Sequence, residues 1–336
     1  MSSPVIAIDA MGGDFGPRCI VPACISFLAS HPAITLTLVG DPDVILRYIG
    51  RHSFDDSRLR IYAATQAVDM AEKPSHALRY KPDSSMRVAL ELVANGGADA
   101  CVSAGNTGAL MAFARQALGM LPSIERPAIY TQLPIMGRHC VLVDLGANLD
   151  CSALNLYQFA CLGAAAAKAD GVSEPRVALL NVGTEQTKGN SVVQQASALL
   201  KKSSHLNYIG FIEANGVFRC EADVVVCDGF AGNVLLKGSE GLVSMLFKHL
   251  DEAPILFKLL AAPLLHRLKK DITPARYNGA GFLGLGGLVI KSHGGADEFG
   301  FQHAIQQAVY AVKLRLNDVI KANFLDLYED SVPKCD

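Results

Sequence analysis

Polar residues able to hold an anion follow a short, strongly apolar run in the last third of the chain. Val224–Val226 is typical of a strand buried on both faces, and Asp228 and Gly229 come directly after it. Gly232–Asn233 then opens an apolar stretch with helical spacing. Unpaired N–H groups and the helix dipole attract anions to a helix start. The segment therefore predicts an anion site at the beginning of this helix.

The same pattern of strand, polar turn and helix recurs along the chain. Four further turns rich in Asp, Asn and Gly end apolar runs, within Val5–Asp14, Ala100–Gly108, Val141–Asn148 and Val177–Asn190. The carboxyl ends of parallel strands meet at one sheet edge, where open α/β proteins bind ligands, so we expect these turns to converge. Few cationic side chains accompany them. The pattern predicts a small anion held largely by backbone groups.

Composition narrows the class of protein. A chain of 336 residues, half of them hydrophobic, can bury a substantial core as one large α/β domain or two smaller ones. The net charge of −2 argues against a general nucleic-acid binder. No apolar run reaches the roughly 18 residues of a membrane span, and Met1–Pro4 lacks the charged region of a signal peptide. Nine scattered cysteines without a CxxC pair fit reduced thiols, which predicts a cytoplasmic protein.

Apolar periodicity predicts alternating strands and helices from end to end. Expected strands are 5–8, 34–39, 100–102, 128–133, 141–143, 177–180, 208–212, 224–226 and 288–290. Expected helices are 17–30, one from Asp43, one after Ser84–Ser85, 107–118, 154–169, 191–200, 241–250 and 299–319. Residues 52–83 are interpreted as a surface loop and the last dozen residues as frayed. We predict a three-layer αβα sandwich with a mostly parallel sheet, organised as a single domain over residues 1–336.

Residues 236–275 interrupt this regularity. Pro254 and Pro263 flank or break an apolar segment at 255–265, and the basic cluster Arg267–Lys270 follows it. Eleven mostly apolar residues are too few to cross a bilayer. They predict a protruding helical hairpin that either enters a membrane interface beside anionic lipid or buries leucines in a dimer contact, and the two can coexist. Under the first interpretation, Leu260→Glu weakens liposome association.

Several common catalytic motifs are absent from the sequence. It contains no GxxxxGK[ST], no HExxH and no GxSxG. The glycine-dense stretch Gly281–Gly287 precedes its strand, whereas a dinucleotide fingerprint follows one. No serine or cysteine is marked as a nucleophile, so a covalent acyl-enzyme is not indicated.

Six motifs, kept in order over essentially the whole chain, resemble the PlsX family of bacterial phosphate acyltransferases. They are Ile8–Asp14, Ser103–Met111, Asp144–Asn148, Asn181–Asn190, Asp228–Asn233, and Tyr277–Gly279 through His293–Gly294. The resemblance implies a fold similar to isocitrate and isopropylmalate dehydrogenases and to phosphotransacetylase. It also implies a homodimer, cytoplasmic and peripherally membrane-associated. Neither a cofactor nor a nucleic-acid partner is expected.

The resemblance implies attack of inorganic phosphate on a fatty acyl thioester of acyl carrier protein. The acyl phosphate formed would feed the downstream membrane glycerol-3-phosphate acyltransferase of phospholipid synthesis. Because phosphate is itself a nucleophile, positioning can supply much of the acceleration.

Three residues are the catalytic candidates of this reaction. We place the phosphate against the helix starts after Asn106 and Asn233, with Lys188 as its cationic partner. The Asn233 amide would donate to the phosphate or the oxyanion, and His293 would protonate the thiolate or bind phosphate. The alternatives are an exposed loop lysine, a helix N-cap and a structural histidine.

Further residues are expected to line the phosphate and substrate site: Asp9, Gly12, Asn106, Thr107, Asn148, Asp228 and Gly232. The strand-end acids, which include Asp144, could instead cap their turns or hold Mg²⁺, although their spacing dictates no metal geometry. Acyl carrier protein would dock on exposed basic residues, with Arg79, Lys81, Arg87 and Arg267–Lys270 as candidates, or these are solvated surface charges.

Three other functions compete with this one. A phosphotransacetylase-like transfer involving coenzyme A would require that thiol, whereas the first hypothesis does not. A metal-dependent hydroxyacid dehydrogenase would reduce a nicotinamide and is disfavoured by the missing fingerprint. A membrane-recruited scaffold would have no activity for Lys188→Ala to remove.

Overall fold

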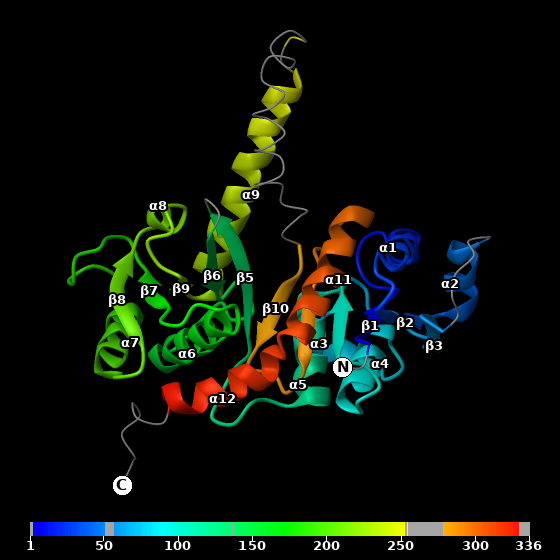
Figure 1. The fold of residues 1–336 in the computed structure, drawn as a ribbon, viewed down its shortest axis with the longest axis horizontal. Helices are drawn as coiled ribbons and strands as arrows, with labels where there is room; N and C mark the ends of the chain where they lie inside the picture. Colours follow the sequence, from blue (N-terminus) through cyan, green and yellow to red (C-terminus); the bar gives the residue numbers. More distant parts are fainter. Residues whose placement is uncertain (1–2, 51–56, 136–137, 253, 255–277, 329–336) are drawn as a thin grey trace.

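One sheet organises the molecule. The computed structural model describes residues 3–50, 57–135, 138–252, 254 and 278–328. Within these ranges eleven strands join in the order β3-β2-β1-β4-β11-β10-β5-β6-β9-β7-β8, with helices on both faces (Figure 1). Seven of the ten strand pairings are parallel. The predicted three-layer sandwich with a mostly parallel sheet is confirmed.

The first half of the sheet contains five mutually parallel strands. They are β1 (Val5–Asp9), β2 (Thr35–Gly40), β3 (Leu59–Ala63), β4 (Ala100–Ser103) and β11 (Leu288–Lys291). The helices of this half are α1 (Pro17–Ser30), α2 (Pro42–Ile49), α3 (Pro74–Tyr80), α4 (Ser85–Ala94) and α5 (Thr107–Leu118). The predicted helices 17–30 and 107–118 are confirmed with the same bounds.

The second half contains four strands that are parallel to one another. They are β6 (Arg138–Val143), β9 (Val224–Val226), β7 (Arg176–Leu180) and β8 (Asn207–Ile212). Its helices are α6 (Ala153–Ala169), α7 (Ser191–Lys202), α8 (Ala214–Val217) and α9 (Gly229–Glu252). The two halves meet through β5 (Ala128–Ile135) and β10 (Ala280–Leu283), and α11 (Glu298–Lys313) and α12 (Leu316–Tyr328) complete the helical layers.

Alternating side chains give the sheet two apolar faces. Ile6 and Ile8 of β1 belong to one core cluster with Phe27 of α1, while Ala7 between them belongs to a second cluster with Leu90 of α4. Successive strand residues point to opposite faces, so a strand covered on both sides must be apolar throughout. This explains the near-continuous apolar runs in the sequence.

Strand direction reverses between the two halves. Three successive pairings, β11 with β10, β10 with β5 and β5 with β6, are antiparallel. Consequently β1, β4 and β11 run opposite to β6, β9 and β7. The expectation that all the polar turns share one sheet edge is therefore wrong: the turns after β1, β4 and β11 lie at one edge and those after β6, β9 and β7 at the other.

Several predicted elements differ from the structure. Residues 52–83 were expected to be a loop but contain β3 and α3, and β10 was not predicted at all. The final helix is two helices, α11 and α12, divided at Arg315, whose φ is 52°. The second of them continues to Tyr328, into the segment expected to be frayed.

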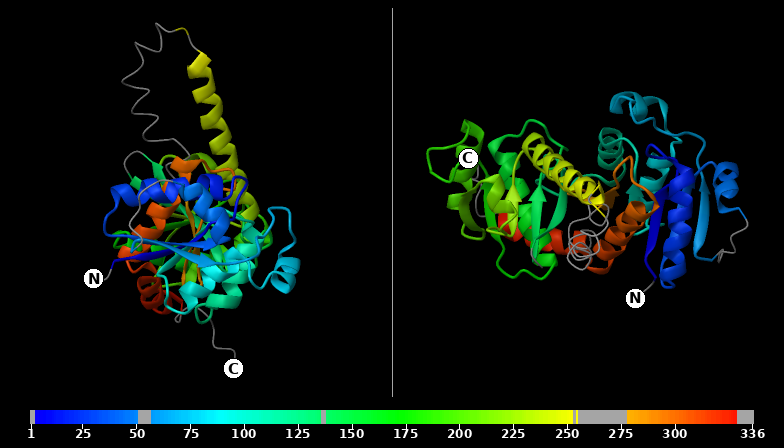
Figure 2. Two further views of the ribbon diagram at one scale, coloured as in Figure 1. Left: turned by 90° about the vertical axis from the view of Figure 1, so that its right-hand side faces the viewer. Right: turned by 90° about the horizontal axis from the view of Figure 1, so that it is seen from above.

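Helix α9 is one continuous element that leaves the body of the molecule. It begins at Gly229, before the predicted opening at Gly232–Asn233, and continues to Glu252. Figure 1 and the left-hand view of Figure 2 show its far end standing away from the sheet. The predicted second arm of a hairpin, with 255–265, Leu260 and Arg267–Lys270, lies outside the described residues. Among the helices that the structure describes, none is both long and apolar enough to span a membrane.

Candidate active site

A first cluster of polar groups surrounds Asp9 at the end of β1. Its carboxylate is 1% exposed, and the hydroxyls of Ser85 and Ser103 each donate to it at 2.6 Å. These serines come from α4 and β4, so Asp9 ties three elements together. Burial raises the pKa of Asp9, while the two hydroxyls and the nearby Lys291 ammonium oppose that shift. Ser84 is the N-cap residue of α4 but makes no side-chain cap, and the hydroxyl of Ser85 donates to Asp9.

Lys291, the last residue of β11, brings a buried cation to this cluster. Its ammonium is 9% exposed and donates to the carbonyl of Ala104 at 3.3 Å and to that of Ser292. Burial lowers the pKa of Lys291 to about 8, and the carboxylates of Asp9 and Asp14 oppose that shift. A lysine ammonium has three N–H donors. Two of those of Lys291 bind carbonyl oxygens, so the third remains for a further acceptor.

His293 follows two residues later and is exposed. Its backbone N–H donates to Asn278 Oδ1 at 2.8 Å, and its ring Nδ1 accepts from the Gly295 N–H at 3.1 Å. Desolvation lowers the pKa of His293, and the charge on Lys237 lowers it further. The ring is therefore neutral near pH 7, and because Nδ1 is an acceptor the proton lies on Nε2. His293 therefore carries one ring N–H donor, on Nε2.

The start of α5 adjoins the same edge, since β4 leads directly into it. Asn106 is its N-cap: Oδ1 accepts from the Ala109 N–H at 3.0 Å, and Nδ2 donates to the carbonyls of Met70 and Glu72 at 2.8 and 3.0 Å. The side chain of Asn106 is thus fully engaged, while Thr107 begins the helix. Gly12 is required by packing, because a Cβ there would lie 2.5 Å from Asp9 Oδ2.

A second cluster surrounds Asp144 at the end of β6. The carboxylate is fully buried and accepts five hydrogen bonds of 2.7 to 3.2 Å from the backbone of Ile129, Leu145, Ala147 and Asn148 and from the Asn148 amide. Burial raises the pKa of Asp144, and these donors oppose the shift. Asn148 also donates to the Pro127 carbonyl at 2.8 Å. Asp144 and Asn148 therefore stabilise the loop that contains them.

The turn after β9 packs directly on this loop. Asp228 caps α9 by accepting from the Ala231 N–H at 2.7 Å. A Cβ on Gly232 would lie 1.9 Å from the Asp144 carbonyl oxygen, so only glycine fits there. Because α9 begins at Gly229, Asn233 lies inside the first turns of the helix. It is exposed, and a Cβ built on Gly146 would lie 3.7 Å from Asn233 Cβ.

Helix α9 connects the two clusters. Asn233 lies against Gly146 of the second cluster, and Lys237 is close enough to the first to lower the pKa of both His293 and Lys291. Residues four apart share one helical face and are separated by about 6 Å along the axis. Lys237 also pairs with Glu240 at 2.7 Å. One face of α9 thus carries an amide and an ammonium between the two sheet edges.

Lys188 lies on the exposed loop between β7 and α7. Its backbone carbonyl accepts from the Asn181 amide at 3.1 Å and from Gln194. Within the described ranges its ammonium forms no ion pair, and no hydrogen bond joins it to either cluster. The loop is held through its backbone, which leaves the Lys188 side chain free to point to solvent or substrate.

Four residues of this arrangement, Ser85, Ser103, Lys291 and Lys237, were not predicted from sequence. Ser103 ends β4 and opens the motif Ser103–Met111, and Lys291 ends β11 two residues before His293, so their positions in the polar-turn pattern could have marked them as site residues. Lys237 could have been found from helical spacing, because it lies four residues after Asn233 and therefore on the same face of α9. Among the described residues, no group of three or more His, Cys, Asp or Glu side chains gathers as metal ligands.

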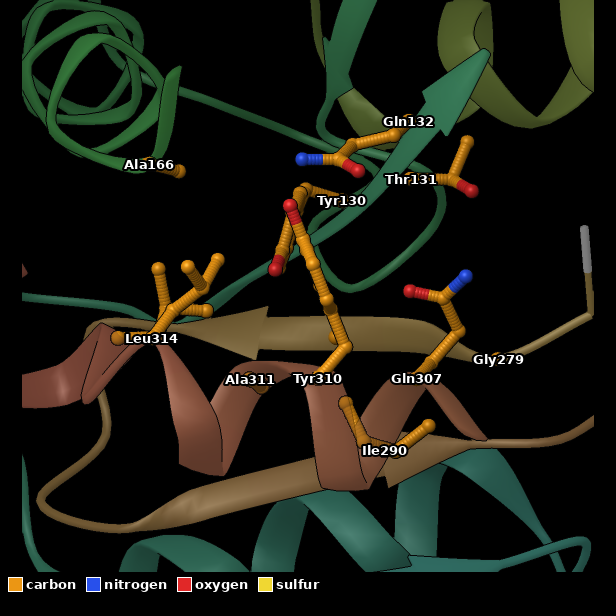
Figure 3. A pocket seen from close by; sticks show the side chains of 12 residues that line it. Tyr130, Thr131, Gln132, Ala166, Gly279, Ile290, Gln307, Tyr310, Ala311 and Leu314 are labelled. Carbon is orange, nitrogen blue, oxygen red and sulfur yellow. The ribbon is translucent and has the colours of Figure 1, made fainter. Parts of the chain in front are cut away.

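A separate cavity lies between β5, β10 and α11. Figure 3 shows the side chains of Tyr130 and Tyr310 next to each other, with Gln132 and Gln307 around them. The cavity measures about 30 Å³, and a single water needs roughly 10–15 Å³. It therefore has room for about two waters and is too small for a fatty acyl chain.

Comparison with known proteins identifies relatives along the whole chain. A family model described as fatty acid synthesis protein matches residues 5–319. A phosphate acyltransferase of Pseudomonas paraeruginosa is 57% identical over 323 residues, 94% of this chain and 96% of the relative. One from Pseudomonas syringae pv. syringae is 55% identical over 337 residues, 98% and 99% of the two chains.

Solved structures with the same fold are more distant in sequence. EutD phosphotransacetylase from Staphylococcus aureus matches with a TM-score of 0.62 at 17% identity, covering 93% of this chain and 95% of that one. A 4-hydroxythreonine-4-phosphate dehydrogenase from Klebsiella pneumoniae matches with a TM-score of 0.57 at 14% identity, covering 93% and 100%. These confirm the expected fold, shared by phosphotransacetylases and a group of dehydrogenases.

Proposed function

The chain belongs to the fatty acid synthesis protein family and is an enzyme that transfers acyl groups to phosphate, and from that premise we propose that its donor is the fatty acyl thioester of acyl carrier protein. The products would be acyl phosphate and free carrier protein. The acyl phosphate would be consumed by the membrane glycerol-3-phosphate acyltransferase that begins phospholipid synthesis. The observation that supports this site most directly is the α9 face that carries Asn233 and Lys237 between the two clusters.

In this proposal, the first cluster holds the phosphate. The His293 Nε2–H, the Lys237 ammonium and the first N–H groups of α5 at Thr107 are its donors. Asp9 acts indirectly, because its buried carboxylate fixes β1, β4 and α4 around them. Such pre-positioned donors in a partly desolvated site are the largest single contribution in many acyl transfers.

The Asn233 amide is proposed to stabilise the oxyanion. A phosphate oxygen attacks the thioester carbon, the carbonyl oxygen becomes negatively charged, and the C–S bond then breaks to release the carrier thiolate. Asn148 and Gly232 would position Asn233 indirectly. Asn148 stabilises the loop next to Asn233, and Gly232 packs on the Asp144 carbonyl of that loop. We keep Lys188 as a second cation, carried to the phosphate by its exposed loop.

The activity is tested by incubating the pure protein with acyl-acyl carrier protein and labelled inorganic phosphate. We expect labelled acyl phosphate and free carrier thiol in equal amounts. A parallel reaction with acyl-coenzyme A tests the phosphotransacetylase-like alternative, which the fold of the solved relatives also accommodates. Labelled product from coenzyme A alone would replace the carrier protein as donor, and no labelled product from either would refute the proposal.

We extend the proposal to self-association and membrane contact through α9. Phe230, Val234 and Leu242 of this helix are 66%, 54% and 55% exposed, with Met245 and Leu246 beyond them. An apolar row of this kind on a protruding helix favours a second surface. A homodimer with peripheral membrane association would cover it. Light scattering and liposome flotation of Leu242→Glu against Lys248→Glu test both contacts.

A further inference from the structure

A shallow groove runs between α3 and α5 on the outer surface of the first half of the sheet. Its lining is Ser75, Leu78, Arg79, Ala112, Arg115 and Gln116. Leu78 and Ala112 form a partly exposed apolar floor, whereas Arg79 and Arg115 are exposed on opposite sides, one on each helix. The groove thus combines an apolar strip with two guanidinium groups.

The charges of this groove are uncompensated. Its lining contains two arginines and no carboxylate, and within the described residues neither Arg79 nor Arg115 forms an ion pair. Arg79 instead stacks on the exposed Tyr80 ring at 5.4 Å, which leaves its N–H groups available. The overall charge of the chain is −2, so this local excess of positive charge is not a general property of the surface.

The neighbouring basic residues behave differently. Lys81 pairs with Glu72 at 3.1 Å, and Arg87 pairs with Glu91 at 2.8 Å. Both had been candidates for carrier-protein docking alongside Arg79. The structure separates them from it, because their charges are already matched by acids of the same chain.

The groove connects physically to the proposed phosphate site. Arg115 lies eight residues after Thr107, so about 12 Å of α5 separates it from the helix start. Helix α3 packs against that start: a Cβ on Gly108 would lie 2.8 Å from Pro74 Cγ, and Asn106 donates to the Met70 and Glu72 carbonyls just before α3. A protein seated here would be adjacent to the reacting groups.

We propose that the α3–α5 groove, with Arg79 and Arg115, is the docking surface for the acidic protein that carries the acyl thioester. This inference rests on the proposed function. An acidic helix laid along the groove would pair its carboxylates with the two guanidiniums and cover Leu78 and Ala112. Such complementary charges act chiefly on encounter and register.

The test measures steady-state kinetics of the charge-reversed double variant Arg79→Glu/Arg115→Glu. We expect KM for acyl-acyl carrier protein to rise about tenfold or more, with kcat changed less than about twofold. Activity with a small acyl thioester such as acyl-N-acetylcysteamine should stay within about twofold, because that donor has no protein to dock. The matched control is Arg47→Glu/Arg60→Glu, two exposed arginines on α2 and β3.

The two levels of the inference fail in different ways. If the wild-type enzyme forms no acyl phosphate from the carrier-bound thioester, the proposed donor is wrong. If the wild-type enzyme does form it and the double variant keeps its KM, the docking surface is wrong. An equal loss with the small thioester would also overturn the inference, because it would show a general disturbance of α3 and α5.

Direct binding provides a measurement independent of turnover. Dye-labelled apo carrier protein, which lacks the thiol arm, should bind the wild type with salt-sensitive affinity and the double variant about tenfold more weakly. The milder Arg79→Ala/Arg115→Ala variant should give the same direction with an unchanged unfolding midpoint. Equal displacement of the probe by DNA and by unlabelled carrier protein would mean a non-specific cationic patch and would contradict the proposal.

Discussion

Asp9 ends β1 and Asp144 follows β6, one in each half of the sheet, and the two carboxylates have different hydrogen-bond partners. Asp9 accepts from two side-chain hydroxyls of other elements and has the Lys291 ammonium nearby. Asp144 accepts from four backbone N–H groups and one amide. The first arrangement joins distant elements around a charge, and the second fixes one loop.

This difference shows that one sequence pattern serves two physical purposes. In the first cluster an acid and a glycine after a strand lie close to cationic side chains, and this is where we propose that the anion binds. In the second cluster the acid accepts hydrogen bonds from backbone N–H groups, and the glycine allows close packing against the backbone. Two of the proposed reactive groups, Asn233 and Lys237, are contributed by α9, which connects the second cluster to the first.

The largest loss of activity should come from substitution of Asn233, because its amide is the group through which the second cluster would take part in catalysis. Asn233→Ala should lower kcat by about 10²–10³ with little change in KM for phosphate, as expected for a lost oxyanion donor. Asn207→Ala, at an exposed asparagine outside both clusters, is the control. A kcat within about threefold of wild type for Asn233→Ala would leave the second cluster purely structural.

The two aspartates should respond differently to the same isosteric change. Asp144→Asn places an NH₂ group against backbone N–H groups, which can only donate and therefore cannot accept a hydrogen bond from it. We expect a loss of about 2–3 kcal/mol in the free energy of unfolding. Asp9→Asn should lose less than about 1 kcal/mol, because a serine hydroxyl can rotate to accept. Urea unfolding measures both, and equal losses would remove the distinction drawn between the clusters.

His293 should contribute through its Nε2–H. His293→Ala should reduce kcat/KM about 10–100-fold, whereas His293→Gln, which retains an N–H donor, should recover part of it. The depressed pKa also sets a sign: as pH falls below the ordinary 6.5, the unfolded chain protonates first and the native state loses stability. His293→Gln should lack this loss, measured as unfolding free energy across that range. Identical acid limbs in the two proteins would show that His293 is not the titrating group.

The smallest effect concerns Lys291. Its native pKa of about 8 lies below the ordinary 10.5, so the unfolded chain binds more protons between these values and stability from this group rises with pH. Compared with Lys291→Met, the wild type should gain unfolding free energy from pH 8 to 10.5. Parallel pH profiles would place the Lys291 ammonium in contact with solvent.

Much of the fold could be predicted because apolar periodicity is a local signal. Helix 107–118 begins at an asparagine cap and ends before a glycine, and the valines of β9 are buried on both sides. Strand β10 could not be found, since Ala280–Leu283 is short and contains glycine, and one of its two partners, β5, is distant in the sequence. The reversal of direction between the two halves depends on the pairing of β10 with β5, which is non-local and which periodicity does not encode.

The turns that contain the site residues could be predicted from the sequence, but not how those turns are arranged in space. Asn106 and Asp41 act as helix caps because a cap depends only on adjacent residues. The position of Asn233 was misjudged by one helical turn, as Asp228 rather than Gly232 precedes the first N–H groups of α9. Lys237 approaches His293 only through tertiary packing, and the contact of the Lys291 ammonium with Ala104 likewise depends on the pairing of β11 with β4.

Direct attack by phosphate is the central claim, and oxygen labelling tests it most directly. The enzyme is mixed with acyl-acyl carrier protein and ¹⁸O-phosphate, quenched during turnover, and both product and intact protein are weighed by mass spectrometry. We predict acyl phosphate whose bridging oxygen carries the label and a protein of unchanged mass. A protein heavier by one acyl group, or unlabelled fatty acid as the main product, would contradict the account.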